Sequence, residues 1–394
     1  MKPTEIKKDI FWVGGIDWDL RNFHGYSTER GSTYNSYLIL DKKTVLVDTV
    51  KSHLFPEMCS RIGKVTDISK IDYVVSSHTE MDHSGSLPEI MKLSPNATVI
   101  TSPNGEKALK KHYSHNWKTL VVNTGDKVNI GSRNLNFVLM PMVHWPDSMA
   151  TYVAEDKLLL PNDAFGQHIA SVERFDSEME WEILRSEAAK YYANIVLPYG
   201  EQVNKVLGAV SPLDIDMIAP SHGIIWRKYI KEIAGLYKKW SSNITDDKAV
   251  IVYDTMWHST EKMAYAVFEA FTNKGIKALL MNLETNHMSD IMTEIMTAKY
   301  ICVGSPTLNN GMLPQIGAFL TYMKGLAPKN RTALAFGSYG WGGQSVGLIE
   351  DIFKSCGFRT FDGIKAQWVP GADELAGITA RVERDIDIDK GGEK

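Results

Sequence analysis

Short apolar runs that end in polar loops dominate the chain up to about residue 240. Two of these runs, Tyr34–Leu40 and Thr44–Val47, flank the polar triplet Asp41-Lys42-Lys43 and predict a hairpin. Helices are expected near Gly105–His112 and Glu178–Tyr192. Further strands are predicted at four apolar runs that polar or proline-containing loops close: Tyr73–Ser76, Thr98–Thr101, Leu135–Met140 and Leu158–Leu160. Mixed strands and helices of this kind predict a layered α/β sandwich.

The pattern changes near residue 245 to a repeating order of strand, loop and helix. Each repeat begins with an apolar run and continues into a helical pattern, and the four runs are Ala249–Tyr253, Ala278–Met281, Tyr300–Val303 and Thr332–Phe336. This alternation predicts a doubly wound parallel sheet, whose ligands bind at the carboxyl ends of the strands. We therefore expect two domains, residues 1–246 and 247–394, with a charged tail that frays from Asp385 on.

Composition and charge limit the class of protein and the kinds of partner to expect. Hydrophobic residues make up 44% of the 394 residues and charged residues 23%, as in soluble globular proteins. The formal charge of -4 gives no electrostatic reason to expect nucleic acid or an anionic membrane as partner. No apolar run approaches the roughly 20 residues that span a bilayer. Three widely spaced cysteines (Cys59, Cys302 and Cys356) and no signal-peptide pattern favour a cytoplasmic location.

The most informative run is Ser77-His78-Thr79-Glu80-Met81-Asp82-His83, directly after an apolar strand. Such a run is usually a solvated polar loop, but further candidate ligands also follow apolar strands. These candidates are His144 after Phe137–Val143, Asp163 after Leu158–Leu160, and His222 after Ile215–Ala219. Polar residues that repeatedly follow apolar strands are what a site built on rigid elements needs. Four imidazoles and three carboxylates suffice for two metal ions with one carboxylate between them.

This set resembles the metallo-β-lactamase superfamily over about the first 245 residues. The loop of that superfamily reads His-x-His-x-Asp-His, and a His, an Asp and a final His follow it. Glu80 stands where hydrolases of the superfamily have a second His. A carboxylate in place of an imidazole makes the site harder and more anionic, which favours iron over zinc. The loop with Glu at this position resembles the flavodiiron proteins.

Three loops after the predicted C-terminal strands suggest a flavin site. The first loop, Asp254–Thr260, resembles the flavodoxin phosphate loop, although His258 stands where flavodoxins usually carry Gly. Two glycine-rich loops follow later strands, and Tyr339 and Trp341 could stack on a planar ring. Glycine-rich turns with packed aromatics would explain either later loop, but not three loops at successive strand ends. The expected FMN-binding residues are Thr255, Met256, Trp257, Ser259, Thr260, Pro306, Thr307, Leu308, Asn309, Ser338, Tyr339, Gly340, Trp341 and Gly342.

Both halves in this order resemble the flavodiiron proteins, or A-type flavoproteins, over essentially the whole chain. The segments His144-Trp-Pro-Asp-Ser-Met and Ser305-Pro-Thr-x-Asn-Asn-Gly fit that family closely. The resemblance implies that His78, Glu80 and His144 hold one iron, that Asp82 and His222 hold the other, and that Asp163 bridges them. His83 ligates the second metal in some members and stands off the metal in others. His24 and Tyr192 are expected to line the substrate pocket. The simpler alternative for His24 is a histidine that packs on the surface.

The resemblance also implies the reaction and the partners. Two irons and FMN would reduce dioxygen to water, nitric oxide to nitrous oxide, or both, and we lean towards dioxygen. No pair of CxxC motifs follows the flavin region, so the donor is expected to be a separate protein such as rubredoxin, or a reduced deazaflavin. A head-to-tail homodimer, or a dimer of dimers, is expected. Two alternatives stay open at this stage: a zinc hydrolase with an accessory flavodoxin-like domain, and an electron carrier with a structural metal.

Overall fold

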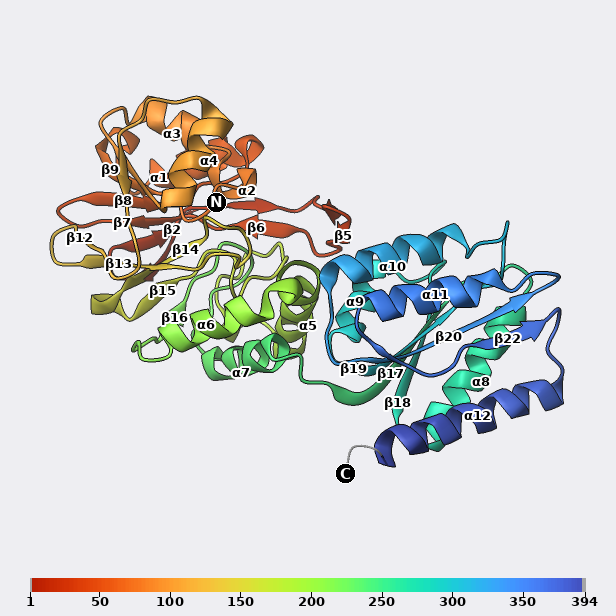
Figure 1. Ribbon diagram of the computed structural model, residues 1–394. Helices are drawn as coiled ribbons and strands as arrows, with labels where there is room; N and C mark the ends of the chain where they lie inside the picture. The colour runs from red at the N-terminus through yellow and green to blue at the C-terminus, as the bar shows by residue number, and fades with distance from the viewer. Residues whose placement is uncertain (1, 392–394) are drawn as a thin grey trace. The chain divides into compact units, whose positions relative to one another are not determined.

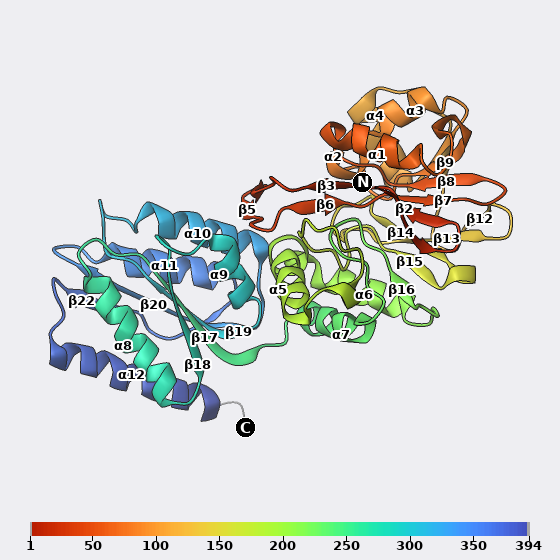
Figure 2. The same cartoon turned by 180° about the vertical axis from the view of Figure 1, so that it is seen from behind.

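A computed structural model describes residues 2–391 of the chain (Figures 1 and 2). The chain divides into two compact units. The first holds the residues up to Tyr192 together with Tyr199–Ser241, and the second holds Ala193–Pro198 together with the residues from Ser242 on. The short segment Ala193–Pro198 thus belongs to the second unit, although it lies within the first along the sequence.

The first unit is built on two sheets. The larger sheet has the order β1-β2-β7-β8-β9-β10-β11, with bounds Thr4–Lys7, Ile10–Trp12, Tyr37–Ile39, Thr44–Val47, Ile71–Val75, Thr98–Thr101 and Thr119–Val121. The smaller sheet has the order β12-β13-β14-β15-β16, with bounds Lys127–Asn129, Asn134–Leu139, Met149–Val153, Leu158–Leu160 and Met217–Ile218. Two short ribbons complete the unit: β3 (Gly15–Asp17) with β6 (Ser32–Tyr34), and β4 (Asn22–Phe23) with β5 (Tyr26–Ser27).

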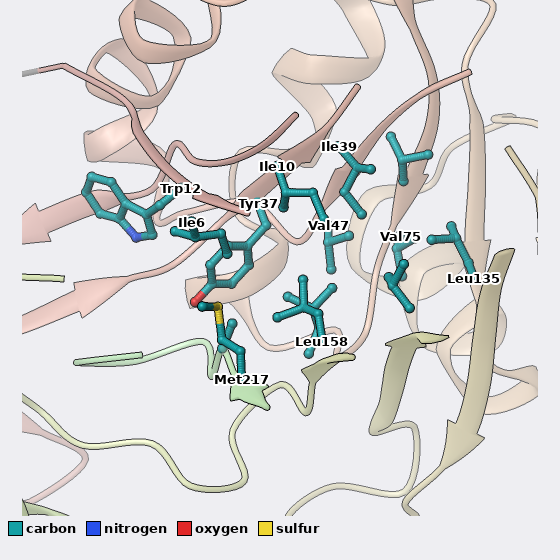
Figure 3. Packing of buried hydrophobic residues seen from close by; sticks show 14 of the residues in the cluster. Ile6, Ile10, Trp12, Tyr37, Ile39, Val47, Val75, Leu135, Leu158 and Met217 are labelled. Carbon is teal, nitrogen blue, oxygen red and sulfur yellow. The ribbon is translucent and has the colours of Figure 1, made fainter. Parts of the chain in front are cut away.

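The inner faces of the two sheets enclose the core of this unit. Side chains such as Ile39 and Val47 from the larger sheet pack with Leu135 and Leu158 from the smaller one (Figure 3). All four are fully buried. Alternate residues of each strand point into this space, because side chains alternate between the two faces of a sheet. Burial of this apolar surface therefore holds the two sheets face to face.

Helices cover the outer faces of both sheets. On the larger sheet, α1 (Phe55–Ile62), α3 (Leu87–Leu93) and α4 (Pro103–Tyr113) pack against strands β7 to β10. The helices α5 (Trp181–Tyr191), α6 (Gly200–Val210) and α7 (Ile230–Ser241) lie beyond the smaller sheet (Figures 1 and 2). The layers are therefore helix, sheet, sheet and helix (αββα), and the predicted layered α/β sandwich is confirmed.

The second unit contains one parallel sheet. Its strand order is β18-β17-β19-β20-β21, and β22 also pairs with β20. The bounds are Asp246–Tyr253 for β17, Lys277–Asn282 for β18, Ala298–Gly304 for β19, Thr332–Tyr339 for β20, Arg359–Thr360 for β21 and Ile364–Gln367 for β22. The second strand of the unit, β18, lies at the edge, and the first strand, β17, lies between β18 and β19. This is the flavodoxin-like order of a doubly wound sheet. This confirms the predicted fold class of the second half.

Helices cover both faces of the parallel sheet as well. The face that α8 (Ser259–Asn273) and α12 (Ala372–Gly391) cover is opposite to the face that α9 (Met288–Ile295), α10 (Pro314–Leu326) and α11 (Gln344–Ser355) cover (Figure 1). The expected fraying from Asp385 on is wrong for the described residues. Ile386 is buried against the sheet, and the buried carboxylate of Asp389 lies 2.7 Å from Arg359. A buried apolar side chain and an ion pair thus anchor the last turns of α12.

Among the described residues, no helix is both long and apolar enough to cross a membrane.

Candidate functional site

The seven expected metal ligands of the first unit lie together, each on a loop that follows a strand. His78, Glu80, Asp82 and His83 follow β9, and Asp82 and His83 lie in the short helix α2 (Met81–Ser84). The other three, His144, Asp163 and His222, follow β13, β15 and β16. The larger sheet thus supplies one loop and the smaller sheet three. Because the strands are packed in the core, they hold these loops at defined positions.

Asp163 lies between two groups of ligands. Its Oδ2 atom is 3.3 Å from His144 Nε2 and 3.8 Å from His78 Nε2. Its Oδ1 atom is 3.1 Å from His83 Nε2 and 3.3 Å from His222 Nε2. One carboxylate oxygen therefore faces each group. Two sets of donor atoms are close enough to hold a metal ion each: His78, His144 and Asp163 in the first, and Asp82, His83 and His222 in the second.

Each group also has a carboxylate of its own: Glu80, which joins the first group, and Asp82, already counted in the second. In the first group, Glu80 Oε2 lies 3.3 Å from His78 Nε2 and 3.4 Å from His144 Nε2. In the second group, Asp82 lies 3.2 Å from His222 Nε2 and 3.3 Å from His83 Nε2. The structure therefore brings together all seven expected ligands, including His83, which falls in the second group.

The carboxylates make this site attract positive charge. Burial alone would lower the pKa of His78, but hydrogen bonds to Asp147 and Glu80 outweigh it and raise the pKa to about 9. Burial is likewise outweighed at His222, where Asp163 and Asp82 raise the pKa to about 10. The pKa of Asp163 is held well below its usual range, since the nearby imidazoles outweigh its burial. An environment that favours protonated imidazoles equally favours metal cations.

Unpaired polar atoms show that the site fits metal ions. Both carboxylate oxygens of Asp82 and of Asp163, and both ring nitrogens of His83, are buried and have no hydrogen-bond partner within the described chain. Buried polar atoms without partners cost free energy, so such atoms are rare in folded proteins. Two divalent or trivalent cations among four imidazoles and three carboxylates would satisfy the carboxylate oxygens and one ring nitrogen of His83.

Neighbouring groups orient the ligands. His78 Nδ1 lies 3.3 Å from the carboxylate of Asp147, which also accepts a 2.7 Å hydrogen bond from the Thr79 backbone N–H. His222 Nδ1 donates to the backbone carbonyl of Thr33 over 2.8 Å. A proton held on Nδ1 leaves Nε2 free to face a metal ion.

The two expected pocket residues have different positions. His24 Nε2 lies 3.1 Å from Glu80 Oε1, so His24 borders the site, with a side chain that is 74% exposed. Tyr192, in contrast, packs against Tyr237 and Trp240 and does not contact the ligands. The tyrosine that borders the site is its neighbour Tyr191, whose ring lies 5.9 Å from that of His222. Consecutive residues at the end of a helix point about 100° apart, so only one of the two can face the metals.

Sequence reasoning also missed His168. Its imidazole is fully buried among Phe23, Tyr191 and His222, and its Nδ1 shares a 2.7 Å hydrogen bond with Ser32. Burial and the adjacent His222 hold the pKa of His168 well below its usual range, so the ring is neutral. The only sequence clue was its place five residues after Asp163.

The second unit contains a cavity of about 580 Å³ at the carboxyl ends of its strands. Of the expected FMN-binding residues, all but Thr255, Thr260 and Leu308 line it. Three residues that were not among the expected FMN-binding residues also line it, namely Asn310, Trp368 and Val369. The ring centroids of Trp341 and Trp368 lie 6.1 Å apart at its edge, and Trp341 is 90% exposed. Exposed indoles beside a cavity provide flat faces for a planar ring.

The first loop of this cavity suits a phosphate. Helix α8 begins at Ser259, and its first backbone N–H groups have no partners within the helix. His258 has φ of 63°, a left-handed conformation that explains why glycine suits this position. The Thr255 hydroxyl is buried without a hydrogen-bond partner in the described chain. The cavity, its aromatic edge and this loop together fit FMN.

Gly340 is required by the packing of the cavity wall. A Cβ atom at this position would lie 2.9 Å from the ring of Trp368, so any side chain would displace the indole. Gly340 thus allows close packing against a ring of the protein itself.

Comparison with known proteins relates both units to one family. Residues 33–223 match the ODP family beta lactamase domain, and residues 251–379 match the flavodoxin domain. A nitric oxide reductase of Moorella thermoacetica is 45% identical over 95% of this chain and 96% of its own. The rubredoxin oxygen:oxidoreductase of Desulfovibrio gigas has 38% identity and a TM-score of 0.95 over 98% of this chain and 99% of its own. The flavodiiron protein of Giardia intestinalis has 32% identity and the same TM-score over 98% of this chain and 96% of its own.

These relatives cover both units in the same order, and the site and cavity fit the two cofactors. The zinc hydrolase alternative is not favoured, because relatives that match nearly the whole chain are named as oxidoreductases. The chain therefore belongs to the flavodiiron proteins, oxidoreductases that carry a diiron centre on a β-lactamase-like domain and FMN on a flavodoxin domain.

Proposed function

We propose that this protein reduces both dioxygen and nitric oxide at its diiron site, with electrons that pass through FMN. The observation that carries the proposal is the position of Asp163, whose two oxygens face two separate groups of imidazoles. A carboxylate shared in this way suits two metals that act on one small molecule. The relatives named above, one a nitric oxide reductase and one an oxygen oxidoreductase, support both substrates.

We assign one iron to His78, Glu80 and His144, and the other to Asp82, His83 and His222, with Asp163 between them. When bound, the irons and the flavin supply the redox chemistry: four electrons for dioxygen to water, or two for the coupling of two nitric oxide molecules to nitrous oxide. The protein's own side chains select the metal and orient its ligands. Glu80 supplies the anionic oxygen ligand that favours iron, and Asp147 orients His78.

Aromatic side chains surround the site. Trp145 packs edge-on against His78 at 4.8 Å, and Phe23 packs against His24 and His168. We propose that His24 holds Glu80 and that Tyr191 and His168 line the substrate pocket. Apolar and neutral walls suit an uncharged diatomic gas.

We propose FMN for the cavity of the second unit, with its phosphate at the start of α8 and its ring beside Trp341 and Trp368. The electron donor is a separate small protein, most simply rubredoxin. The name of the Desulfovibrio gigas relative supports this choice. A cytoplasmic location stays a prediction from the cysteine pattern.

Stopped-flow oxidation of the fully reduced protein tests the function. We expect both gases to reoxidise flavin and iron within seconds, because typical enzyme turnover is about 1 to 1,000 per second. Products are measured as water without peroxide for dioxygen, and as nitrous oxide for nitric oxide. The preference for dioxygen stays a prediction, which the ratio of the two rates decides.

Failure with both gases would contradict the proposal and favour an electron carrier with a structural metal. Zinc without iron in freshly purified protein would instead favour a hydrolase. An Asp163→Ala preparation with intact flavin is the control for flavin reacting with dioxygen by itself.

We propose further that the working unit is a head-to-tail homodimer in which the flavin of one chain serves the metals of the other. Mixing two inactive variants tests this. Asp163→Ala lacks the metal bridge, and Ser259→Glu places a carboxylate at the start of α8, where it would repel the phosphate of the flavin. Hybrid dimers would contain one intact flavin and metal pair across the interface. We expect recovery of about a quarter of wild-type activity, since half of random dimers are hybrid and each holds one working pair.

The control is each variant mixed with itself under the same exchange conditions. Absence of recovery, with subunit exchange shown by mass labelling, would contradict electron transfer between chains and leave transfer within one chain.

A further inference from the structure

Asp48 is a buried carboxylate that belongs to neither group of metal ligands. It directly follows strand β8 and is 4% exposed. Its φ of 56° is left-handed, a conformation that Asp and Asn tolerate better than most other residues with a side chain. Its backbone is fixed on both sides, because its N–H donates to the Val75 carbonyl and its carbonyl accepts from the Ser36 hydroxyl, both at 2.8 Å. The direction of its side chain is therefore well determined.

The carboxylate of Asp48 joins three different loops. Its Oδ1 atom accepts a 2.8 Å hydrogen bond from the Ser77 backbone N–H. Its Oδ2 atom faces Asn162 Nδ2 at 3.4 Å and Ser221 Oγ at 3.5 Å, which are long contacts. Asn162 and Ser221 also bond to each other, through Asn162 Nδ2 and Ser221 Oγ at 3.1 Å. One carboxylate thus lies at the centre of a network that connects loops of both sheets.

Each of these three partners immediately precedes a proposed iron ligand. Ser77 precedes His78, Asn162 precedes Asp163, and Ser221 precedes His222. A shift of any partner would therefore carry its ligand with it.

The next residue extends the same connection to a fourth ligand. The N–H and the hydroxyl of Thr49 both donate to the backbone carbonyl of His83, at 2.8 and 2.6 Å. The pair Asp48-Thr49 thereby contacts the loops that carry ligands of both irons.

We propose that Asp48 is a positioning residue of the diiron site, which sets the mutual distance of the loops that carry His78, Asp163 and His222. This inference rests on the iron ligands assigned in the proposed function. A metal site needs its ligands within about 0.5 Å of the productive geometry. No single strand spaces these three loops, because they follow β9, β15 and β16.

The variant Asp48→Asn tests the proposal. Asparagine has the same shape and tolerates the same φ, but its amide nitrogen cannot accept a hydrogen bond where the second carboxylate oxygen does. We expect ferrous iron to bind about 10- to 100-fold more weakly, as for changes beside metal ligands. Anaerobic competition with a chromophoric chelator measures this affinity on the full chain. The electron paramagnetic resonance signal of the half-oxidised iron pair should also broaden, because the ligand geometry becomes heterogeneous.

Asp176→Asn is the matched control. Asp176 is a fully buried carboxylate of the same unit, and it accepts hydrogen bonds from the backbone N–H groups of residues 227, 228 and 229. Among the described residues, the hydrogen bonds of its carboxylate reach no loop residue next to a ligand. We expect this variant to lose thermal stability and to retain wild-type iron affinity and spectrum. A purely structural role of Asp48 would make the two variants alike.

Ser221→Ala removes one arm of the network and keeps the test valid if Asp48→Asn does not fold. We expect it to weaken iron binding about threefold or more, and the double variant to fall short of the product of the two single effects, since both act through one contact. Wild-type iron affinity in both single variants would overturn this inference alone. Wild-type protein that bound no iron would overturn the proposed function, and this inference with it.

Discussion

Replacing Asp163 by alanine should remove both irons and abolish gas reduction. Its two oxygens lie 3.1 to 3.3 Å from imidazoles of both groups, so its loss should disturb both proposed metal positions. Four imidazoles would remain, with Glu80 beside one group and Asp82 in the other. Changes beside a metal ligand cost about 10- to 100-fold in affinity, so loss of the shared ligand should exceed about 100-fold at both irons. Elemental analysis of iron per chain and the turnover rate with each gas measure the effect.

Flavin content should stay at the wild-type level in this variant, because the FMN cavity is built from residues of the other unit. Asp176→Ala is the control for loss of a buried carboxylate in the first unit, and it should retain iron. A variant at Asp163 that kept two irons and turned over at the wild-type rate would contradict the bridging assignment.

Replacing Glu80 by histidine should exchange iron for zinc. The change restores the ligand type of the hydrolases and removes an anionic oxygen that lies 3.3 to 3.4 Å from two of the imidazoles in its group. Softer nitrogen ligands and a lower negative charge favour zinc over iron. We expect the ratio of zinc to iron to rise at least about tenfold and gas reduction to fall in proportion to the iron lost. Cells grown with equal supplies of both metals provide the comparison, by elemental analysis of the purified protein.

Glu80→Asp separates the type of ligand from its length. It keeps a carboxylate, so it should keep the preference for iron even if the shorter side chain lowers affinity. Histidine in place of Glu80 with unaltered iron content and full turnover would show that position 80 is not a ligand.

Sequence patterns predicted the central strands of both units and several helices, and they placed the candidate ligands at strand ends, for a local physical reason. Apolar runs such as Thr44–Val47 and Thr332–Phe336 form strands because their side chains pack into the hydrophobic cores on the faces of the sheets. Polar residues that directly follow such runs must lie at sheet ends. His144, Asp163 and His222 could therefore be predicted as neighbours, although they are far apart in the chain.

Only the tertiary structure decided which neighbours in sequence face the site. Tyr191 borders His222 and Tyr192 does not, because adjacent positions at the end of α5 point in different directions. The sequence also did not reveal that the last turns of α12 are packed. Asp389 is buried there through partners on other elements, Tyr300 and Arg359.

The sequence by itself determined the chemistry of this protein: iron-type ligands in one half, flavin-binding loops in the other, and the order of the two domains. The tertiary structure decided how those groups are arranged. Asp163 presents one oxygen to each group of imidazoles, His83 joins the second group, and Asp48 connects three ligand loops. These relations depend on distances between segments far apart in the chain. Periodicity and spacing describe only what adjacent residues do, so such distances emerge only when the sheets pack.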